Sequence, residues 1–381
     1  MKKTLLILLA LISLGNIYAQ DKPNAITTAA PFLMIAPDAR AGGMGDIGVA
    51  TKPNGSSQHF NPAKYSFAEY QYAVQVNFTP WLRNLTNDIY LGNLNVSNRI
   101  NEQSAWSASI KYFSLGTIDL TNDLGLSIGS ENPNEYSLGG SYSLKLNNTF
   151  ALAVALSYIH SDMSLKIENS DIQTINTYSV GISGYYQSPE KNYGNINGIW
   201  RGGFNISDIG PKVQLIVGGS NESFISTNLR LGGGFEIILD DMNSITPNVE
   251  FNKLLVPTPP IRDNKTGEIT SGKDDNVGFL PGIFQSFGDA PNGFSEEIKE
   301  FIWSAGAEYM YDNTLGIRLG YFNESDVKGA RKYFTLGAGF KFKNSNIDFS
   351  YLINSSDVNN PLENTLRFSL TFNFGDIYDS Y

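Results

Sequence analysis

The feature that most constrains the fold is a unit of alternating residues that recurs along most of the chain. Its clearest copy covers residues 136–160, where large apolar residues such as Leu138, Leu152 and Val154 occupy every second position and small or polar residues lie between them. Period-two alternation places the two sets on opposite faces of a strand. Asn147-Asn148 separates the two arms, and such a pair can supply the positive φ angles of a tight hairpin turn.

The length of each arm bears on where the large apolar face points. Each arm has about ten residues, the length with which a tilted strand crosses a bilayer. A water-soluble protein would bury that face in a core, whereas a membrane barrel turns it toward lipid. Beyond the amino terminus, no stretch approaches the roughly 18 apolar residues of a membrane helix. A membrane location would therefore require a closed barrel, because open sheets leave backbone groups unpaired in lipid.

The same alternation predicts about fourteen strands, an even number as in single-chain bacterial barrels. Connections after even-numbered strands are mostly tight, and those after odd-numbered strands are mostly longer. The tight ones match the short periplasmic turns of such barrels, and the longer ones match their outer loops. We therefore predict an all-β fold, a transmembrane antiparallel β-barrel, with both termini on the periplasmic side. The predicted strands lie near residues 69–78, 88–96, 106–112, 136–146, 150–160, 178–186, 200–206, 225–237, 245–251, 301–311, 315–321, 334–342, 347–353 and 366–374.

Composition agrees with a barrel and excludes several kinds of site. The chain has 20 Tyr and 23 Phe but only 17% charged residues, which favours a barrel with aromatic rings at the membrane interfaces. It has no Cys, so disulfides, thiolate metal sites and cysteine nucleophiles are excluded. A formal net charge of -10 argues against nucleic acid as a partner, because nothing offsets the phosphate charge.

The two ends of the chain do not show the strand pattern. Residues 1–19 have two lysines, an apolar run and Ala19 at the expected cleavage point, which predicts a secretory signal peptide. Residues 20–68 are rich in proline and glycine, and we expect them to form a plug below or inside the barrel that spans 69–374. Residues 375–381 are expected to be a short periplasmic tail.

The glycine cluster at residues 43–48 formally matches a dinucleotide-binding fingerprint. That fingerprint needs a buried strand before it, a helix after it and an acid about twenty residues further on. Here Pro37 precedes the cluster and Pro53 follows it. We expect instead a turn-rich segment in which glycine lets the backbone pack closely against its surroundings.

Two stretches of the same segment carry a family resemblance. The Asn-Pro-Ala triplet ahead of the first strand resembles the barrel family of the long-chain fatty-acid transporter FadL. The longer stretch at 36–45, with the strand count and the aromatic-rich end, is similar to the PorV (LptO) family, outer-membrane proteins of the type IX secretion system of the Bacteroidetes; the sister group PorQ shares this likeness. The motif residues are Asp38, Arg40, Gly42, Gly43 and Gly45, and Asn61, Pro62 and Ala63.

The resemblance implies a non-enzymatic role in the cell outer membrane. Proteins of this family associate with the translocon barrel SprA (Sov), engage the carboxy-terminal signal domains of secreted cargo, and pass the cargo to an attachment complex with the sortase-like PorU. Outer-membrane lipid and lipopolysaccharide would surround the barrel. The FadL likeness implies an alternative, a transporter of hydrophobic small molecules.

The sequence carries no recognisable motif for catalysis, for a cofactor or for a metal. His59 and His160 are the only histidines, and no third ligand is spaced to join either of them. Neither a nucleophile elbow nor a His-Glu-x-x-His motif occurs. The acid pairs Asp240-Asp241 and Asp274-Asp275 lie in turn or loop contexts, where solvated charge is the usual explanation. We therefore expect no catalytic, cofactor or metal site.

The best candidate for partner binding is the predicted outer loop at 256–297. It is longer than unstructured connections usually are. Its first half is polar and its second half is apolar, and exposed apolar segments usually contact something. We expect its apolar residues to insert into the translocon or grip cargo; the alternative is that they fold back and cap the barrel mouth. These residues are Phe279, Leu280, Ile283, Phe284, Phe287 and Phe294.

Overall fold

The computed structural model describes residues 23–378 with the exception of 83–85, 87, 123, 164–171, 195, 217–221 and 357–362. The predicted signal peptide at 1–19 lies outside the described residues. Within them, no helix is both long enough and apolar enough to cross a membrane.

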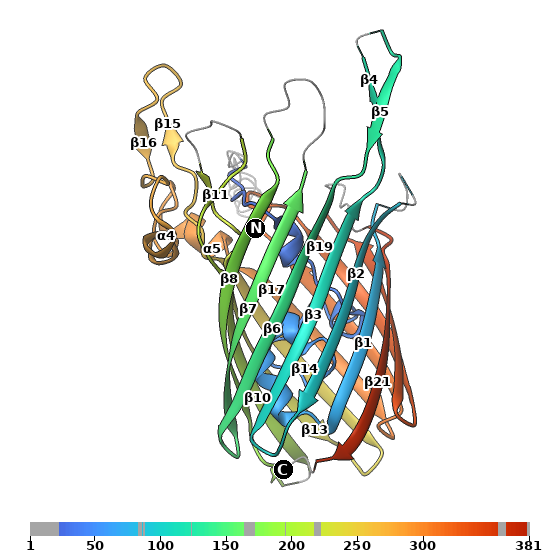
Figure 1. The fold of residues 1–381 in the computed structure, drawn as a ribbon. Helices are drawn as coiled ribbons and strands as arrows, with labels where there is room; N and C mark the ends of the chain where they lie inside the picture. Colours follow the sequence, from blue (N-terminus) through green and yellow to red (C-terminus); the bar gives the residue numbers. More distant parts are fainter. Residues whose placement is uncertain are drawn as a thin grey trace, which may run out of the picture.

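Fourteen antiparallel strands form a closed barrel (Figure 1), which confirms the predicted fold class. The barrel closes where the first strand pairs with the last, for example Val74 opposite Phe372. The strands are β1 (Tyr70–Pro80), β2 (Ile89–Arg99), β3 (Ser104–Leu115), β6 (Asn134–Asn147), β7 (Phe150–Asp162), β8 (Ile175–Gln187), β10 (Asn197–Ile209), β13 (Asn228–Ile238), β14 (Asn243–Leu254), β17 (Ile302–Tyr311), β18 (Leu315–Asn323), β19 (Lys332–Phe342), β20 (Ser345–Asn354) and β21 (Leu366–Ile377).

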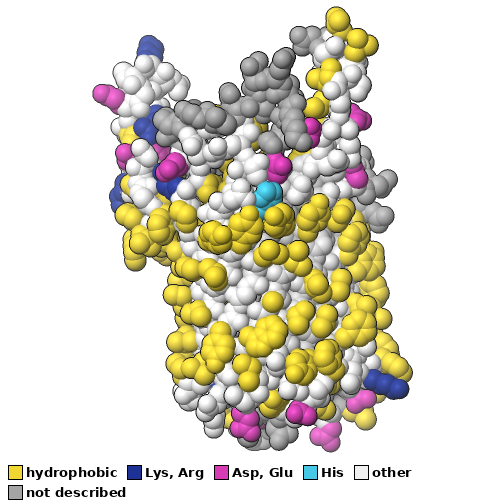
Figure 2. All heavy atoms as spheres, in the orientation of Figure 1, with side chains coloured by type: hydrophobic (Ala, Val, Ile, Leu, Met, Phe, Trp, Pro, Cys, Tyr) yellow, Lys and Arg dark blue, Asp and Glu magenta, His cyan; other side chains and the backbone are white. Residues whose placement is uncertain are grey.

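The alternating pattern sorts side chains between the outside and the lumen. Leu138 and Val154 are exposed on the outer surface, whereas Ala151 and Ala153 are buried inside. Figure 2 shows the outward set as a broad apolar belt across the visible face of the barrel, with charged side chains gathered above and below it. A large apolar face that points away from the protein interior is what a lipid-facing barrel requires.

Tight turns join the strands at one end of the barrel, which we call the short-turn end. The turn between β17 and β18 has Asp312 and Asn313 at φ 50° and 49°, the left-handed pair that a two-residue hairpin favours. The predicted Asn147-Asn148 turn is wrong by one residue, because Asn147 pairs with Phe150. Asn147 instead organises the turn with its side chain, whose Oδ1 accepts hydrogen bonds from the backbone N–H groups of Thr149 and Phe150, each at 2.9 Å.

Longer connections lie at the opposite, long-loop end (Figure 1). One of them forms a hairpin of β4 (Ile118–Thr121) and β5 (Ser127–Glu131) that stands above the barrel. The connection from β14 to β17 contains β15 (Ile261–Arg262), β16 (Ile269–Ser271), α4 (Phe279–Gln285) and α5 (Phe294–Lys299), and it rises on the other side of the view. The remaining short strands are β9 (Lys191–Asn192), β11 (Val213–Gln214) and β12 (Glu222–Ser223).

Residues 23–68 run through the inside of the barrel and form the lumenal segment. The segment begins at the long-loop end, where the Asn24 N–H donates to the carbonyl of Val327 at 2.8 Å. It ends at the short-turn end, where β1 begins, and the chain also finishes there (Figure 1). The described part of the chain therefore begins at one end of the barrel and finishes at the other, and the periplasmic side of both termini stays a prediction. Its helices are η1 (Pro31–Met34), α2 (Ala39–Gly42), α3 (Ser57–Phe60) and η2 (Pro62–Phe67).

Candidate functional site

The motif residue Arg40 joins the lumenal segment to the barrel wall. Its Nε and Nη2 donate to the two carboxylate oxygens of Glu308 at 2.9 and 2.6 Å. Arg318 also donates to Glu308 at 2.7 Å and to Asp348 at 2.7 Å. These charges are buried or nearly so, and a buried charge is stable only when it is paired. The network therefore fixes α2 to β17, β18 and β20.

The Asn-Pro-Ala triplet makes a second attachment. Asn61 Nδ2 donates to the carbonyls of Val49 and Gly184 at 2.8 and 2.9 Å, and its Oδ1 accepts from the Ala63 N–H. Pro62 begins η2, a position where its missing N–H costs nothing. Asn61 is thus both the cap of a helix and a link to β8. Asp38, which precedes α2, accepts from Asn54 Nδ2 at 2.8 Å and so holds two parts of the segment together.

The glycines of the motif allow the segment to touch the strand backbone. A Cβ on Gly43 would lie 2.8 Å from the Cα of Gly337 in β19. Gly45 has φ +74° and lies against the carbonyl of Tyr321. A side chain at either position would force the segment away from the wall. The two glycines thus allow the close backbone packing that the sequence analysis expected.

Other attachments come from residues that the sequence did not single out. Asp46 pairs with Arg367 and accepts from the Tyr333 hydroxyl at 2.6 Å. Glu250 accepts from the backbone N–H groups of Gly48 and Val49, each at 2.8 Å. A sequence signal for these attachments exists, because charged residues occur at the small-residue positions of the strands. These positions face the lumen, where a charge needs a partner.

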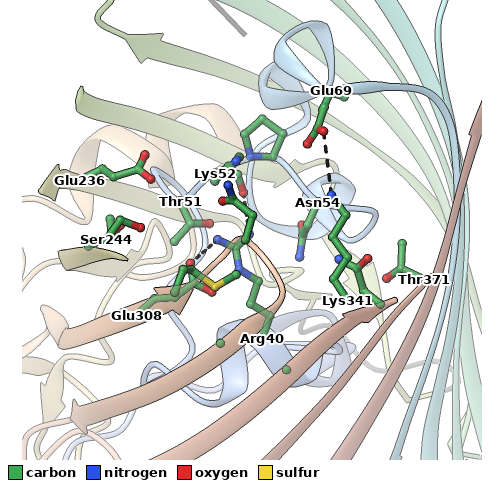
Figure 3. Close-up of a pocket in the computed structure, with 18 of the residues that line it drawn as sticks. Arg40, Thr51, Lys52, Asn54, Glu69, Glu236, Ser244, Glu308, Lys341 and Thr371 are labelled. Carbon is green, nitrogen blue, oxygen red and sulfur yellow. Dashed lines mark hydrogen bonds and ion pairs between the residues drawn. The ribbon is translucent and has the colours of Figure 1, made fainter. Parts of the chain in front are cut away.

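Below the segment, at the short-turn end, lies a polar vestibule of about 490 Å³. Figure 3 shows Arg40 reaching Glu308 from the segment, and Glu69 facing Lys341 across it. Their ion-pair distances are 2.6 and 3.9 Å. Acidic and basic side chains both line the cavity, so its lining differs from the mostly apolar one that suits a hydrophobic ligand.

At the long-loop end a larger cavity of about 760 Å³ lies between the lumenal segment and the wall. Its lining is mostly apolar and includes Phe32, Trp81 and Ile302. Arg367 also lines it, and the Nε of this side chain is buried without a hydrogen-bond partner among the described residues. This cavity suits a hydrophobic molecule of small or medium size.

The connection from β14 to β17 presents an apolar surface, which we call the rim surface. Phe284 and Phe294 are each 78% exposed. Leu280 and Phe287 are also exposed, as is Ile298, which the sequence analysis did not include. Phe279 and Ile283 are half-buried. The six predicted residues therefore lie on α4, on α5 and just after α4, at the side of the long-loop end (Figure 1).

Buried ion pairs beneath the rim surface fix it to the barrel. Lys253 of β14 contacts Glu297 at 3.0 Å and Glu300 at 2.5 Å. Lys328, in the connection from β18 to β19, contacts Glu296 at 2.6 Å and Glu300 at 2.9 Å. All five side chains are at least nine-tenths buried. The exposed aromatic residues thus rest on a rigid base.

Asp289 lies beside this base and gives a compact group of carboxylates with Glu297 and Glu300. Asp289 Oδ2 accepts from the Thr258 N–H at 3.1 Å, while its Oδ1 is buried without a partner among the described residues. Burial, together with the nearby Glu300 and Glu297 carboxylates, raises the pKa of Asp289 to about 6. Lys253 already supplies the cation here, so the group is better understood as an internal ion-pair cluster.

The two histidines lie in different environments. His59 is packed edge-on against Phe60 inside the lumenal segment. His160 stacks on Tyr136 near the end of β7 and its Nδ1 lies 2.9 Å from Asn176 Oδ1. Each therefore has a packing partner rather than a set of metal ligands.

Comparison with solved structures gives outer-membrane barrels at low identity. A TodX deltaS2S3 mutant monoaromatic hydrocarbon channel is 10% identical with a TM-score of 0.51, covering 88% of this chain and 99% of that one. A Pseudomonas aeruginosa FadL homologue is 11% identical with a TM-score of 0.44, covering 93% and 100%. At 10% identity, the likeness to the TodX mutant channel supports the fold alone. A search of curated proteins gives no match.

The family comparison covers well over half of the chain. The family described as "Type IX secretion system protein PorV" matches residues 18–261, which include the lumenal segment and the strands β1 to β14. The outward apolar belt and the closed barrel place such a chain in the outer membrane. The protein therefore belongs to the PorV family of outer-membrane type IX secretion components.

Proposed function

We propose that this chain is a non-enzymatic adaptor that binds the SprA-like translocon barrel and the carboxy-terminal signal domains of cargo. It passes the cargo to a surface attachment complex that contains a PorU-like sortase. The observation that carries the proposal is the rim surface, because exposed aromatic residues on a rigid base resemble the anchors of protein interfaces. Family membership supports a role in type IX secretion in general.

The lumenal segment supports an adaptor rather than a conduit for protein. The buried pairs of Arg40 with Glu308 and of Asp46 with Arg367 tie the segment to β17 and β21 of the wall. Removing one partner of a buried ion pair typically costs about 3–5 kcal/mol, and the segment has several such pairs. Cargo would therefore pass beside this barrel and contact its outer rim.

The test is to replace Phe284 and Phe287 with Asp in a tagged protein. We expect co-purification with the translocon barrel to fall at least tenfold, because one interface anchor is often worth about 2 kcal/mol or more. Barrel folding should be unchanged, as judged by heat-modifiable migration in gels. Ile261→Asp, an exposed residue of the same connection away from the helices, is the matched control. Undiminished co-purification of the double variant would refute the proposal.

A second candidate function is transport of hydrophobic small molecules across the outer membrane. The apolar cavity at the long-loop end favours it. The Nε of Arg367 at the cavity lining has no hydrogen-bond partner among the described residues and is a donor for an anionic head group. Mass spectrometry of protein purified in detergent separates the two functions. A bound lipid-like molecule without any co-purifying translocon would favour transport, and the reverse would favour the adaptor.

A further inference from the structure

The polar vestibule lies at the end of the barrel that the proposed function does not use. It is lined by the lumenal segment, through Arg40 and Lys52, and by inward residues of the wall such as Glu236 and Lys341 (Figure 3). The short turns of outer-membrane barrels lie on the periplasmic side. The vestibule is therefore expected to open toward the periplasm, and a ligand would reach it from inside the cell envelope.

The lining of the vestibule carries more negative than positive charge. Seven acidic and five basic residues line it. Arg40 and Arg318 are already paired with Glu308, at 2.6 and 2.7 Å. Arg201 is paired with Glu236, at 2.6 Å. Because the acids outnumber the bases, pairing inside the cavity leaves a surplus of negative charge.

Part of this surplus lies on two neighbouring short turns, in three exposed residues that we call the acidic lip. Glu190 lies in the connection from β8 to β10, and Asp240 and Asp241 lie in the turn from β13 to β14. The two turns are adjacent because β10 pairs with β13. Glu190 accepts from the Asn197 amide at 2.6 Å, and Asp240 accepts from the Asn243 N–H at 2.8 Å. Neither donor is charged, so these hydrogen bonds leave the negative charge of the lip for a ligand to balance.

A second and independent observation is the hydrogen bonding of the cavity wall. Three amide side chains that line the vestibule have an oxygen that is buried without a hydrogen-bond partner among the described residues: Gln75, Asn248 and Asn346. Gln75 and Asn248 are only 1% and 3% exposed. All three oxygens are acceptors, and a buried acceptor without a donor is destabilising. The cavity therefore lacks hydrogen-bond donors as well as positive charge.

A basic side chain supplies both of the missing features. An ammonium or guanidinium group is positively charged and has several N–H donors but no acceptor. Met242, which lines the cavity beside the lip and is 53% exposed, offers apolar surface for the aliphatic stem of a lysine or arginine. The unpaired acceptors lie on strands and the lip lies on turns, so a ligand that meets both must extend from the wall to the mouth. A chain segment with two or more basic side chains can do so.

We propose that the vestibule is a docking socket for a basic segment of a periplasmic protein, whose lysine or arginine side chains enter past the acidic lip. This inference goes beyond the proposed function, because it concerns the short-turn end and not the rim surface. The barrel would then be held from the periplasm while its rim surface contacts the translocon. A free polyamine has the same chemistry as the segment, and the experiment separates the two sources.

A binding measurement with a defined probe tests the socket. The protein is placed in nanodiscs of zwitterionic lipid, and the probe is a fluorescein-labelled peptide with several arginines separated by glycines. We expect Asp240→Asn with Asp241→Asn to weaken binding at least fivefold at low salt and less at high salt, because exposed charges are screened by ions. Asp274→Asn with Asp275→Asn removes the same charge in the rim connection and should leave the affinity unchanged.

Crosslinking locates the bound peptide, and the natural absence of cysteine gives a clean background. Met242→Cys lies at the lip, and Leu126→Cys is an exposed position at the long-loop end. Each variant is labelled with a benzophenone maleimide. We expect the arginine peptide to crosslink from position 242 and not from 126, and a matched glutamate peptide to crosslink from neither.

Any of three results would overturn the inference. The first is equal affinity of the lip variant and the wild type, with normal heat-modifiable migration of both. The second is crosslinking from position 126 but not from 242. The third is tighter binding of spermine than of the arginine peptide, which would assign the vestibule to a free polyamine. Phe284→Asp with Phe287→Asp should bind the peptide as the wild type does, so failure of the socket and failure of the proposed function are distinguishable.

Discussion

The lumenal segment and the rim connection are both turn-rich stretches with short helices, yet they treat their side chains in opposite ways. The lumenal segment turns charged residues such as Arg40 and Asp46 inward onto charges of the wall. The rim connection buries its charges at the base, through Glu297 and Glu300, and leaves aromatic residues outside. The difference indicates that the first segment packs against the inner wall of the barrel and that the second presents an exposed surface.

The largest effect that would sharpen this comparison comes from removing residues 23–68. The wild-type protein should show little conductance in planar bilayers, because the segment runs through the lumen and is tied to the wall by ion pairs. The deletion should open a channel, since a barrel of this size has a lumen unless something fills it. Equal conductance of the two proteins would contradict a plug. A deletion variant that fails to fold would be replaced by Gly43→Trp, which should displace α2 from β19.

A single buried charge gives the next largest effect. Glu308→Ala leaves Arg40 and Arg318 buried without their shared partner, and the expected loss is about 3–5 kcal/mol of unfolding free energy. Urea unfolding in detergent measures it. Glu268→Ala, at an exposed position of the rim connection, should change the stability by less than about 0.5 kcal/mol. Similar losses in the two variants would show that the lumenal pairs do not hold the segment.

The smallest expected effect concerns pH at the base of the rim surface. The pKa of Asp289 is about 6 in the folded protein and 3.8 ordinarily, so the folded state binds more protons between these values. Stability from this group is therefore present at low pH and is lost as the pH rises through 6. Asp289→Asn should remove that loss, and the variant should be more stable than the wild type at pH 7 by on the order of 2 kcal/mol.

The measurement is the difference in unfolding free energy between wild type and Asp289→Asn from pH 4 to pH 8. The difference should grow in favour of the variant as the pH rises. Asp241→Asn, an exposed position in a turn at the opposite end, should give a difference that does not follow this trend. A difference that does not change with pH for Asp289→Asn would show that burial and the neighbouring carboxylates do not raise the pKa of Asp289.

Much of the barrel could be predicted from the sequence because strand alternation is a local signal. The parity of Leu138 and Val154 already separated the lipid-facing side from the lumenal side, and the spacing of turns separated the two ends. The turn between β6 and β7 lies one residue later than predicted, because Asn147 acts through its side chain rather than through a positive φ.

The site was predicted only in part. The apolar residues of the rim connection were visible as a cluster in the sequence, but their exposure depends on Lys253 and Lys328, which lie outside that cluster. The β4–β5 hairpin was not among the predicted strands, because strands as short as these leave no clear alternation in the sequence.

The sequence by itself determined the number of strands, the face that each side chain takes and the family of the chain, because period, turn residues and motif are all short-range features. Only the tertiary structure decided that the amino-terminal segment runs the length of the lumen and which charges hold it there. Arg40 and Glu308 are 268 residues apart in the chain, and their pairing follows from closure of the barrel. A contact of that range is fixed by the whole sheet and not by the residues around either partner.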